Sequence, residues 1–418
     1  MVRRLQLLAI GAVLVIAAFS TGLPFLFYLL YLAILVIGGS YVVVRLGLTD
    51  LEAGYAVSQL HGHVGDPLRV TYTLRNTSRL PKLWLEVHNP TTLPGGLPGR
   101  ALSLGGRQER SWLIRAPLTR RGHFRIDPLA IRTGDPFGFF EASAAVGQGV
   151  SVVVYPRLEP VPAWKLPAAN IEGSHAAPER THQTTPLATS VRPYAPGDSM
   201  NRIHWKSTAR HGEIQVKEFD LEQTADAWIV LDLQRAIQAG RGDESTTEVA
   251  IRAAAAIADK ALIENRAVGM TVNARRPAYL PPDRGGRQHL KIMQLLAALE
   301  PDGEAPLVEA LVQSVGRLRR GMTAVIVTAS VDPSWVRVLA TLRGRGVAAV
   351  VVLLDAPAFD RIAQQTRAAV TGESWTPDPE LEEIAAKRMR ALRHALAEYE
   401  LKTYQVTPGR PLGEMLSG

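Results

Sequence analysis

Two uncharged apolar runs at the start of the chain constrain its fold more than any other feature. They cover residues 5–19 and 25–44 of a 418-residue sequence, and the charged residues that flank them are arginines. About 20 apolar residues are needed to cross the hydrocarbon core of a bilayer, so the second run is long enough and the first is short but usable. We therefore expect residues 1–48 to hold two transmembrane helices, at about 5–21 and 24–44.

The flanking arginines predict the orientation of this hairpin. Arg3 and Arg4 precede the first run and Arg45 closes the second, so all three would lie on one side of the membrane. The positive-inside rule assigns that side to the cytoplasm, which predicts a multi-pass protein of the cell membrane with cytoplasmic soluble domains. The alternative is a cleaved signal peptide with small residues at Ala18 and Ser20, but a secreted protein would not need a second, longer apolar run directly afterwards.

Composition limits what the rest of the chain can be. Hydrophobic residues make up 46% and charged residues 21%, which suits folded domains, and the length predicts two or three of them. The absence of cysteine excludes disulfides, thiolate metal sites and a cysteine nucleophile. The net charge of +8 suits a protein beside an anionic membrane leaflet, or one that binds nucleic acid.

Residues 51–157 show the short alternations of apolar and polar residues that are typical of antiparallel strands. Turns rich in Gly, Pro and Asn separate the clearest alternations, at 68–74, 82–87, 111–115 and 150–155. We expect an immunoglobulin-like β-sandwich here. The sequence GDPFG at 134–138 is interpreted as a structural corner between two strands, in which Asp135 hydrogen-bonds local backbone.

Residues 158–224 are predicted to be a linker that carries a basic motif at 190–220. Its first part, 159–186, is rich in Pro and Ala, lacks periodicity, and is expected to cross the surface as a loop. Asp198 or Ser199 is expected to cap a short helix in the middle of the motif. The motif crowds cations and aromatic residues together: Arg192, Tyr194, Arg202, His204, Trp205, Lys206, Arg210, His211 and Lys217.

Three functions compete for this motif. A nucleic-acid patch would place its cations on phosphates and its aromatics on bases, but interleaved acids such as Glu213 weaken that hypothesis. An enzyme would use His204 with Asp198 or Glu218 for acid–base chemistry, although the nucleophiles considered near His204 are only Ser199 and Ser207. A docking or structural network, in which the cations pair with the interleaved acids, is the preferred hypothesis.

This pattern resembles the core motif of the domain of unknown function 58 family. The matching residues are Arg192, Tyr194, Gly197, Asp198, Arg202, Ile203, His204, Trp205, Lys206, Ala209, Arg210, Gly212, Lys217 and Glu218. Flanking segments at 121–122, 134–138 and 154–156 are also similar to that family. The resemblance implies a membrane-anchored protein with a von Willebrand factor type A-like domain. It also implies that the protein acts together with a MoxR-type AAA+ ATPase to assemble or activate protein complexes.

Residues 225–408 indicate an α/β domain independently of that resemblance. Apolar strands that alternate with helices predict a parallel sheet covered on both faces. The strands are expected at 227–233, 267–273, 323–328, 347–354 and 403–406. The helices are expected at 244–265, 290–299, 307–319, 333–342 and along an amphipathic stripe at 381–399, with a loop at 284–287.

Ligands of such sheets bind at the carboxyl ends of the strands. In type A domains, the resemblance implies a magnesium site there, built from an Asp-x-Ser-x-Ser run with a Thr and an Asp from later loops. Asp232 is kept in this sequence, but Gln234 and Ala236 replace both serines. A degenerate site would consist of Asp232, Thr328 and Asp332, too few oxygen ligands for magnesium alone, so we expect no metal and no cofactor.

We therefore predict a non-enzymatic scaffold or adaptor that contacts membrane lipid and a protein partner but no nucleic acid. The partner is expected to dock on the basic motif or on the strand ends near Asp232. The docking or structural motif comprises Arg192, Tyr194, Gly197, Asp198, Arg202, His204, Trp205, Lys206, Arg210, Lys217 and Glu218. The alternatives are magnesium-dependent, adhesion-type partner binding through the type A-like domain, and an uncharacterised enzyme that uses His204 and Asp198.

Overall fold

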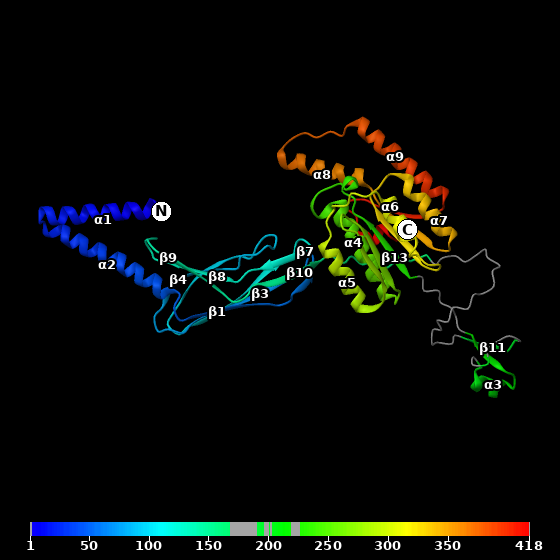
Figure 1. Cartoon of the computed structure of the whole chain (residues 1–418), viewed down its shortest axis with the longest axis horizontal. Helices are drawn as coiled ribbons and strands as arrows, with labels where there is room; N and C mark the ends of the chain where they lie inside the picture. The colour runs from blue at the N-terminus through cyan, green and yellow to red at the C-terminus, as the bar shows by residue number, and fades with distance from the viewer. Residues whose placement is uncertain (1, 168–189, 196–199, 201–202, 219–225, 418) are drawn as a thin grey trace. The chain divides into compact units, whose positions relative to one another are not determined.

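The structure is a computed structural model that describes residues 2–167, 190–195, 200, 203–218 and 226–417. The chain divides into two compact units, which are described separately below (Figure 1). The first comprises Met1–Leu158 and Met293–Leu299, and the second comprises Glu159–Ile292 and Glu300–Gly418.

Two helices open the first unit, as the apolar runs predict. Helix α1 extends over Val2–Thr21 and helix α2 over Pro24–Gly47 (Figure 1). The chain turns at Gly22, which has a φ of +65°, and the rings of Phe19 and Phe27 meet edge to face with centroids 5.4 Å apart. Within the described part of the chain, α2 is the one helix long and apolar enough to cross a membrane, whereas the apolar part of α1 is shorter.

Strands β1 to β10 form the β-rich domain of the first unit. They are β1 Leu51–Val57, β2 His61–His63, β3 Pro67–Asn76, β4 Lys82–His88, β5 Arg100–Leu104, β6 Glu109–Pro117, β7 Gly122–Ile126, β8 Leu129–Gly134, β9 Glu141–Val146 and β10 Val150–Tyr155. They pair in three sheets, with the orders β1-β3-β6, β2-β10-β7 and β5-β4-β8-β9. Alternate residues of β3, from Leu68 to Leu74, are buried in a core shared by strands of all three sheets. All four segments predicted from alternation lie within these strands.

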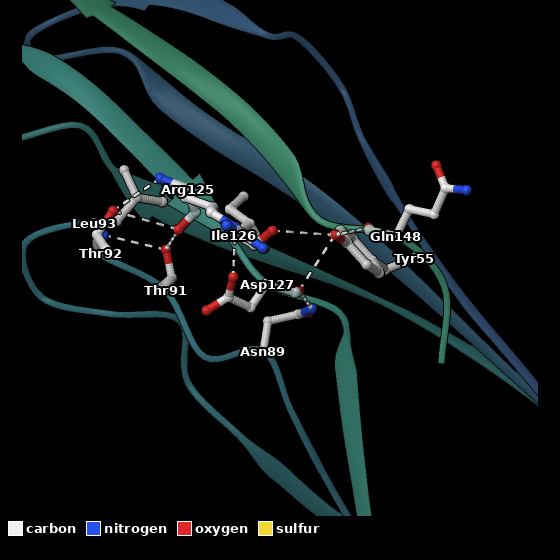
Figure 2. Close-up of polar contacts among 9 residues, drawn as sticks. All are labelled: Tyr55, Asn89, Thr91, Thr92, Leu93, Arg125, Ile126, Asp127 and Gln148. Atoms are coloured by element: carbon white, nitrogen blue, oxygen red, sulfur yellow. Dashed lines mark hydrogen bonds and ion pairs between the residues drawn. The ribbon is translucent and has the colours of Figure 1, made fainter. Parts of the chain in front are cut away.

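A set of hydrogen bonds fixes the corner between β7 and β8 (Figure 2). The hydroxyl of Tyr55 donates to the carbonyl oxygen of Gln148 at 2.7 Å and lies 3.4 Å from that of Asp127. The carboxylate of Asp127 pairs with Arg125 at 2.7 Å, and the side-chain amide of Asn89 donates to the Asp127 carbonyl at 2.9 Å. Burial, and secondarily the charge of Asp127, raises the pKa of Tyr55 above its ordinary value.

The GDPFG segment forms a corner between β8 and β9. Asp135 is buried, and its carboxylate accepts hydrogen bonds from the backbone N–H groups of Phe137 at 2.9 Å and Phe140 at 2.6 Å. Burial opposes ionisation of this carboxyl group, but the surrounding backbone N–H groups, foremost that of Phe140, outweigh it and lower the pKa of Asp135. The charged side chain therefore holds the turn, as the sequence predicts.

The start of the predicted linker is packed into the second unit, and the expectation of a surface loop was wrong for this part. Trp164 is 1% exposed, and Val161 and Leu166 are also buried. Glu159 forms an ion pair with Arg252 at 3.0 Å. Large apolar residues can fill a core without the periodicity of a helix or strand, so their irregular spacing concealed the burial.

A six-stranded sheet forms the centre of the second unit, in the order β15-β14-β13-β16-β17-β18 (Figure 1). Its strands are β13 Ala227–Asp232, β14 Val268–Asn273, β15 Ala278–Asp283, β16 Thr323–Thr328, β17 Ala348–Leu354 and β18 Lys402–Val406. Neighbouring strands are parallel, except that β15 is antiparallel to β14. Every residue of β13, β14 and β16 is buried, as expected for strands covered on both faces.

The α-helices of this region are α4 Thr246–Ile263, α5 Gly285–Ala298, α6 Leu307–Val315, α7 Val336–Gly344, α8 Ala356–Thr371, α9 Pro379–Glu398 and α10 Leu412–Met415 (Figure 1). Trp228 and Val230 of β13 share one core with α6, α7 and α9. Ile229 and Leu231 alternate with them and point to the opposite face, and α4 contacts β13.

Three features differ from the sequence-based expectation for this region. Strand β15 and helix α8 were not predicted. The loop expected at 284–287 was also wrong, because α5 begins at Gly285 within it.

Candidate functional site

The basic motif folds around a two-stranded antiparallel pair. Strand β11 (Ser190–Pro193) pairs with β12 (Gln215–Glu218), and helix α3 (Trp205–His211) lies between them in the chain (Figure 1). Ile203 and Val216 are joined by a β-bridge, and both side chains are buried. These two residues give the small substructure an apolar centre.

His204 begins α3 as its N-cap. Its Nδ1 accepts a hydrogen bond from the backbone N–H of Ser207 at 3.2 Å and lies 2.7 Å from the Ser207 hydroxyl. The backbone N–H of His204 donates to the carbonyl oxygen of Gln215 at 2.8 Å, which ties the cap to β12. Asp198 and Ser199, which the sequence suggested as helix caps, lie outside the described residues.

Helix α3 exposes an aromatic residue and two cations, here called the α3 surface: Trp205, Lys206 and Arg210. Trp205 is 70% exposed, and Lys206 and Arg210 are exposed as well. Gly212 ends the helix in the left-handed conformation, with a φ of +73°. Tryptophan and arginine are the residue types that most often carry the binding energy of protein interfaces, so this arrangement suits a docking surface.

The other predicted residues of the motif are placed in part. Arg192 lies on β11, and Tyr194 follows that strand directly. The backbone of Lys217 and Glu218 belongs to β12. Three members of the predicted motif lie outside the described residues, together with the rest of the predicted linker: Gly197, Asp198, Arg202 and residues 168–189.

A second polar site lies at the carboxyl ends of three neighbouring strands of the six-stranded sheet. The register aligns Asp232 of β13 with Asn273 of β14, and Leu231 with Val327, which brings Thr328 of β16 to the same level. Oδ1 of Asp232 accepts a hydrogen bond from Nδ2 of Asn273 at 2.8 Å. Oδ2 accepts one from the hydroxyl of Thr328 at 2.7 Å. Three strands are thus joined through one carboxylate.

This strand-end site is closed to solvent. Asp232 is 1% exposed. The backbone N–H of Gly303 donates to the carbonyl oxygen of Leu233 at 3.1 Å, and Nδ2 of Asn273 donates to that of Ala305 at 3.0 Å, so the 303–305 loop seals the strand ends. Burial raises the pKa of Asp232, against three hydrogen bonds that lower it. The carboxylate of Asp232 is therefore not exposed to a partner, and docking on the strand ends near Asp232 stays a prediction.

The residues at this site do not fit a magnesium centre. The carboxylate of Asp332 is turned away to cap a short 3₁₀ helix, Pro333–Trp335, by accepting from the N–H (3.1 Å) and the hydroxyl (2.6 Å) of Ser334. Both oxygens of Asp232 are already occupied by hydrogen bonds. Magnesium prefers six oxygen ligands in octahedral geometry, and in the described part of the chain no three His, Cys, Asp or Glu residues cluster as a metal site.

Sequence reasoning missed two contributors to these sites. Asn273 ends the strand next to β13, so the rule that placed Asp232 at a strand end would also have found it. Thr208 accepts a hydrogen bond at its hydroxyl from the backbone N–H of Gln215 at 3.0 Å, which joins α3 to β12. No sequence signal marked Thr208, because the residue that caps α3 is a histidine, which is not among the preferred capping residues.

The fold defines a class of protein in which an apolar N-terminal helix long enough to span a membrane precedes a β-rich domain and a helix-covered α/β sheet. Residues 190–395 match the family described as "Protein of unknown function DUF58". The matched region begins at β11 and ends within α9, so it contains both polar sites.

Two bacterial proteins are similar to this chain in sequence. The uncharacterized protein YeaD of Bacillus subtilis is 24% identical over 282 residues, which cover 65% of this chain and 68% of the relative. The uncharacterized protein Rv1480 of Mycobacterium tuberculosis is 27% identical over 218 residues, which cover 49% of this chain and 68% of the relative. Neither description names an activity.

Two solved structures show limited likeness. The conserved hypothetical protein BatB from Bacteroides thetaiotaomicron aligns with a TM-score of 0.30 and 14% identity, covering 46% of this chain and 95% of that one. The CARDB domain of PF1109 from Pyrococcus furiosus aligns with a TM-score of 0.19 and 16% identity, covering 25% of this chain and 92% of that domain. Likeness at this level carries no conclusion about function.

Proposed function

We propose that this protein is a non-enzymatic, membrane-anchored scaffold or adaptor that holds a protein partner at the inner face of the cell membrane. The partner is a MoxR-type AAA+ ATPase, and the work is the assembly or activation of protein complexes. In this proposal α1 and α2 both cross the bilayer, and the α/β domain is of the von Willebrand factor type A-like kind and faces the cytoplasm.

The observation that carries the proposal is the exposed α3 surface. Trp205 is 70% exposed, so a large apolar side chain remains in water until a partner covers it. The capping bond of His204 and the hydrogen bond from its backbone N–H to Gln215 hold the start of the helix to β12. A helix held in this way, with an aromatic anchor beside two cations, binds a partner without first having to order itself.

Two observations favour binding over catalysis. The imidazole of His204 is engaged in the cap of α3, where Nδ1 meets both the backbone N–H and the hydroxyl of Ser207. The carboxylate of Asp232 is buried and accepts hydrogen bonds from Asn273 and Thr328. Both sets of hydrogen bonds have a structural use.

Anchoring is supported by the length and composition of α2. The helix has 24 residues, and its most apolar window has a mean hydropathy of 2.2. At about 1.5 Å per residue, such a helix is roughly 36 Å long, which exceeds the hydrocarbon thickness of a bilayer. Arg45 in its last turn favours a cytoplasmic location for that end.

Site-specific photocrosslinking tests the proposal. A photoreactive amino acid is introduced at position 205 of the full chain in native-like membranes, and purified MoxR-type ATPase from the same organism is added. The matched control carries the same probe at Ile263, which is 73% exposed on α4. We expect an adduct with the ATPase from position 205 and none from position 263. Equal yields from both positions, or no adduct from either, would contradict the proposal.

A further inference from the structure

Helix α2 is packed directly against one end of the β-rich domain. Nζ of Lys82, a residue only 3% exposed, donates to the carbonyl oxygen of Leu46 in the last turn of α2. A Cβ atom at Gly47 would lie 2.8 Å from the hydroxyl oxygen of Thr133 on β8, so glycine permits this close approach. The ring of Tyr41 meets that of Phe140 edge to face, with centroids 5.7 Å apart. These contacts join the end of the helix to β4, β8 and the corner at 134–140.

These contacts fix the depth of the corner relative to the bilayer. The 21 residues from Pro24 to Val44 span about 31 Å at 1.5 Å per residue, about the hydrocarbon thickness, so a membrane-spanning α2 leaves the bilayer core near Val44. Tyr41 precedes that point by three residues. Because Phe140 packs against Tyr41, the corner at 134–140 lies at the boundary between hydrocarbon and headgroups.

The side chains at this end suit that boundary. Phe137 is 52% exposed and stacks on Phe139 at 5.6 Å, while Leu80, Leu83 and Trp84 are 55%, 61% and 44% exposed. We call these five residues the interfacial cluster. Aromatic residues are enriched at membrane–water interfaces, where an apolar ring and a polar surrounding are both accommodated. In water alone the same cluster would leave several large apolar side chains uncovered.

Cations flank the interfacial cluster. The backbone N–H of Arg107 donates to the carbonyl oxygen of Ser78 at 2.8 Å, and that of Thr77 donates to Asp50 just after α2 at 2.9 Å. The two turns that carry Arg79 and Arg107 therefore lie beside the end of α2, and both arginines are exposed. Exposed arginines at headgroup depth attract anionic lipids, each by about 1 kcal/mol.

We propose that this end of the β-rich domain is a lipid-binding surface, with the interfacial cluster in the headgroup region and Arg79 and Arg107 on anionic lipid phosphates. The inference rests on the proposed membrane span of α2. In this proposal the β-rich domain has a fixed orientation on the bilayer and is not a freely tethered domain. The reason is that Lys82, Thr133 and Phe140 hold the lipid-binding surface to helix α2.

The absence of cysteine from the chain makes a direct test available. Single cysteines replace Phe137, Leu83, Ile34 or Leu60 in the full chain, each carries a nitroxide spin label, and the proteins are reconstituted in vesicles of phosphatidylcholine and phosphatidylglycerol. Collision with oxygen, which partitions into lipid, is compared with collision with a water-soluble nickel complex. Leu60 is the control: it is 47% exposed and follows the end of β1 remote from α2.

We expect labels at Phe137→Cys and Leu83→Cys to be several-fold less accessible to nickel than the label at Leu60→Cys. Ile34→Cys, in the middle of α2, should be accessible to oxygen only. If Ile34→Cys is protected but Phe137→Cys and Leu83→Cys match Leu60→Cys, the lipid-binding surface is refuted while the span stands. Nickel access at Ile34→Cys would refute the span itself. Unchanged protection in phosphatidylcholine alone would refute the role given to Arg79 and Arg107.

Discussion

The hydroxyl of Thr328 donates a 2.7 Å hydrogen bond to Oδ2 of Asp232 and joins the two central strands of the α/β sheet at their carboxyl ends. Asn273, at the end of the neighbouring strand β14, donates a hydrogen bond to the other carboxylate oxygen of Asp232. In a sheet of this kind the same position is where ligands bind. Here the position is filled by the protein's own side chains, which gives Asp232 a structural role.

Substitution of Asp232 separates the hydrogen-bonding role from the charge. Asp232→Ala removes the acceptor of Thr328 and one acceptor of Asn273 in a buried site, so we expect a loss of about 1–3 kcal/mol in the free energy of unfolding. Asp232→Asn keeps the shape and one carbonyl oxygen, and should cost less than the alanine variant. Urea unfolding of the detergent-solubilised full chain, monitored by hydrogen exchange in β13 and β14, measures the loss for each variant. Equal losses would contradict the structural role.

The raised pKa of Asp232 predicts the sign of a pH dependence. Because the folded pKa lies above the ordinary value of about 3.9, the contribution of this group to stability is complete below that value and is lost as pH rises through the folded pKa. The stability of the wild type relative to Asp232→Asn should therefore fall as pH rises from below 4. A relative stability that rises over that range would contradict the assignment.

Asp135 predicts the opposite sign in the other unit. Its folded pKa is lowered, so its contribution is complete above the ordinary value and is lost as pH falls through the folded pKa. Asp135→Asn should weaken the corner at neutral pH, since one oxygen cannot serve the N–H groups of both Phe137 and Phe140. Hydrogen exchange of residues 135–140, corrected for intrinsic rates, should differ between the two proteins at pH 7 and converge in acid. A difference independent of pH would exclude the charge as the cause.

Trp164 tests whether the start of the predicted linker is part of the fold. Its side chain is 1% exposed, so Trp164→Ala should reduce the free energy of unfolding of the second unit by about 3–5 kcal/mol. Trp205→Ala is the matched control, because its side chain is 70% exposed and its loss should change stability by about 0.5 kcal/mol or less. Chemical denaturation measures both. Similar losses for the two would mean that 159–167 is not integral to the core.

Magnesium should not bind at the strand-end site. Asp232 bonds to Thr328, whereas Asp332 caps its own 3₁₀ helix and adds no ligand there. Titration of the full chain with magnesium by calorimetry should give no saturable heat at millimolar concentration. A single-site binding curve that disappears in Asp232→Ala would contradict this prediction and favour the adhesion-type alternative.

Much of the fold could be predicted because burial leaves a periodic trace in the sequence. The alternation at 68–74 and the apolar strands at 227–233 and 323–328 predicted β3, β13 and β16. Strand β15 was missed because it contains two prolines, which are rare in strands except at an edge, where β15 lies. Helix α8 was missed because Phe359 is its one buried residue, which leaves almost no apolar stripe to detect.

The sites were less accessible to sequence reasoning, since their geometry depends on tertiary contacts. The predicted strand ends placed Asp232 and Thr328 correctly. They could not show that the carboxylate of Asp332 bonds to Ser334 and does not join these two residues. His204 was not expected as a cap, because histidine is not among the preferred capping residues. The exposure of Trp205 could not be read from the sequence, where a tryptophan between cations suits a core position as well.

Binding of the ATPase to the α3 surface is the most direct test of the proposed function. The full chain in vesicles is titrated with purified MoxR-type ATPase from the same organism, and the Kd is measured for wild type, Trp205→Ala and the exposed control Ile263→Ala. We predict saturable binding by the wild type, a Kd raised at least about tenfold by Trp205→Ala, and no change with Ile263→Ala. No binding by the wild type, or one Kd for all three proteins, would contradict the proposal.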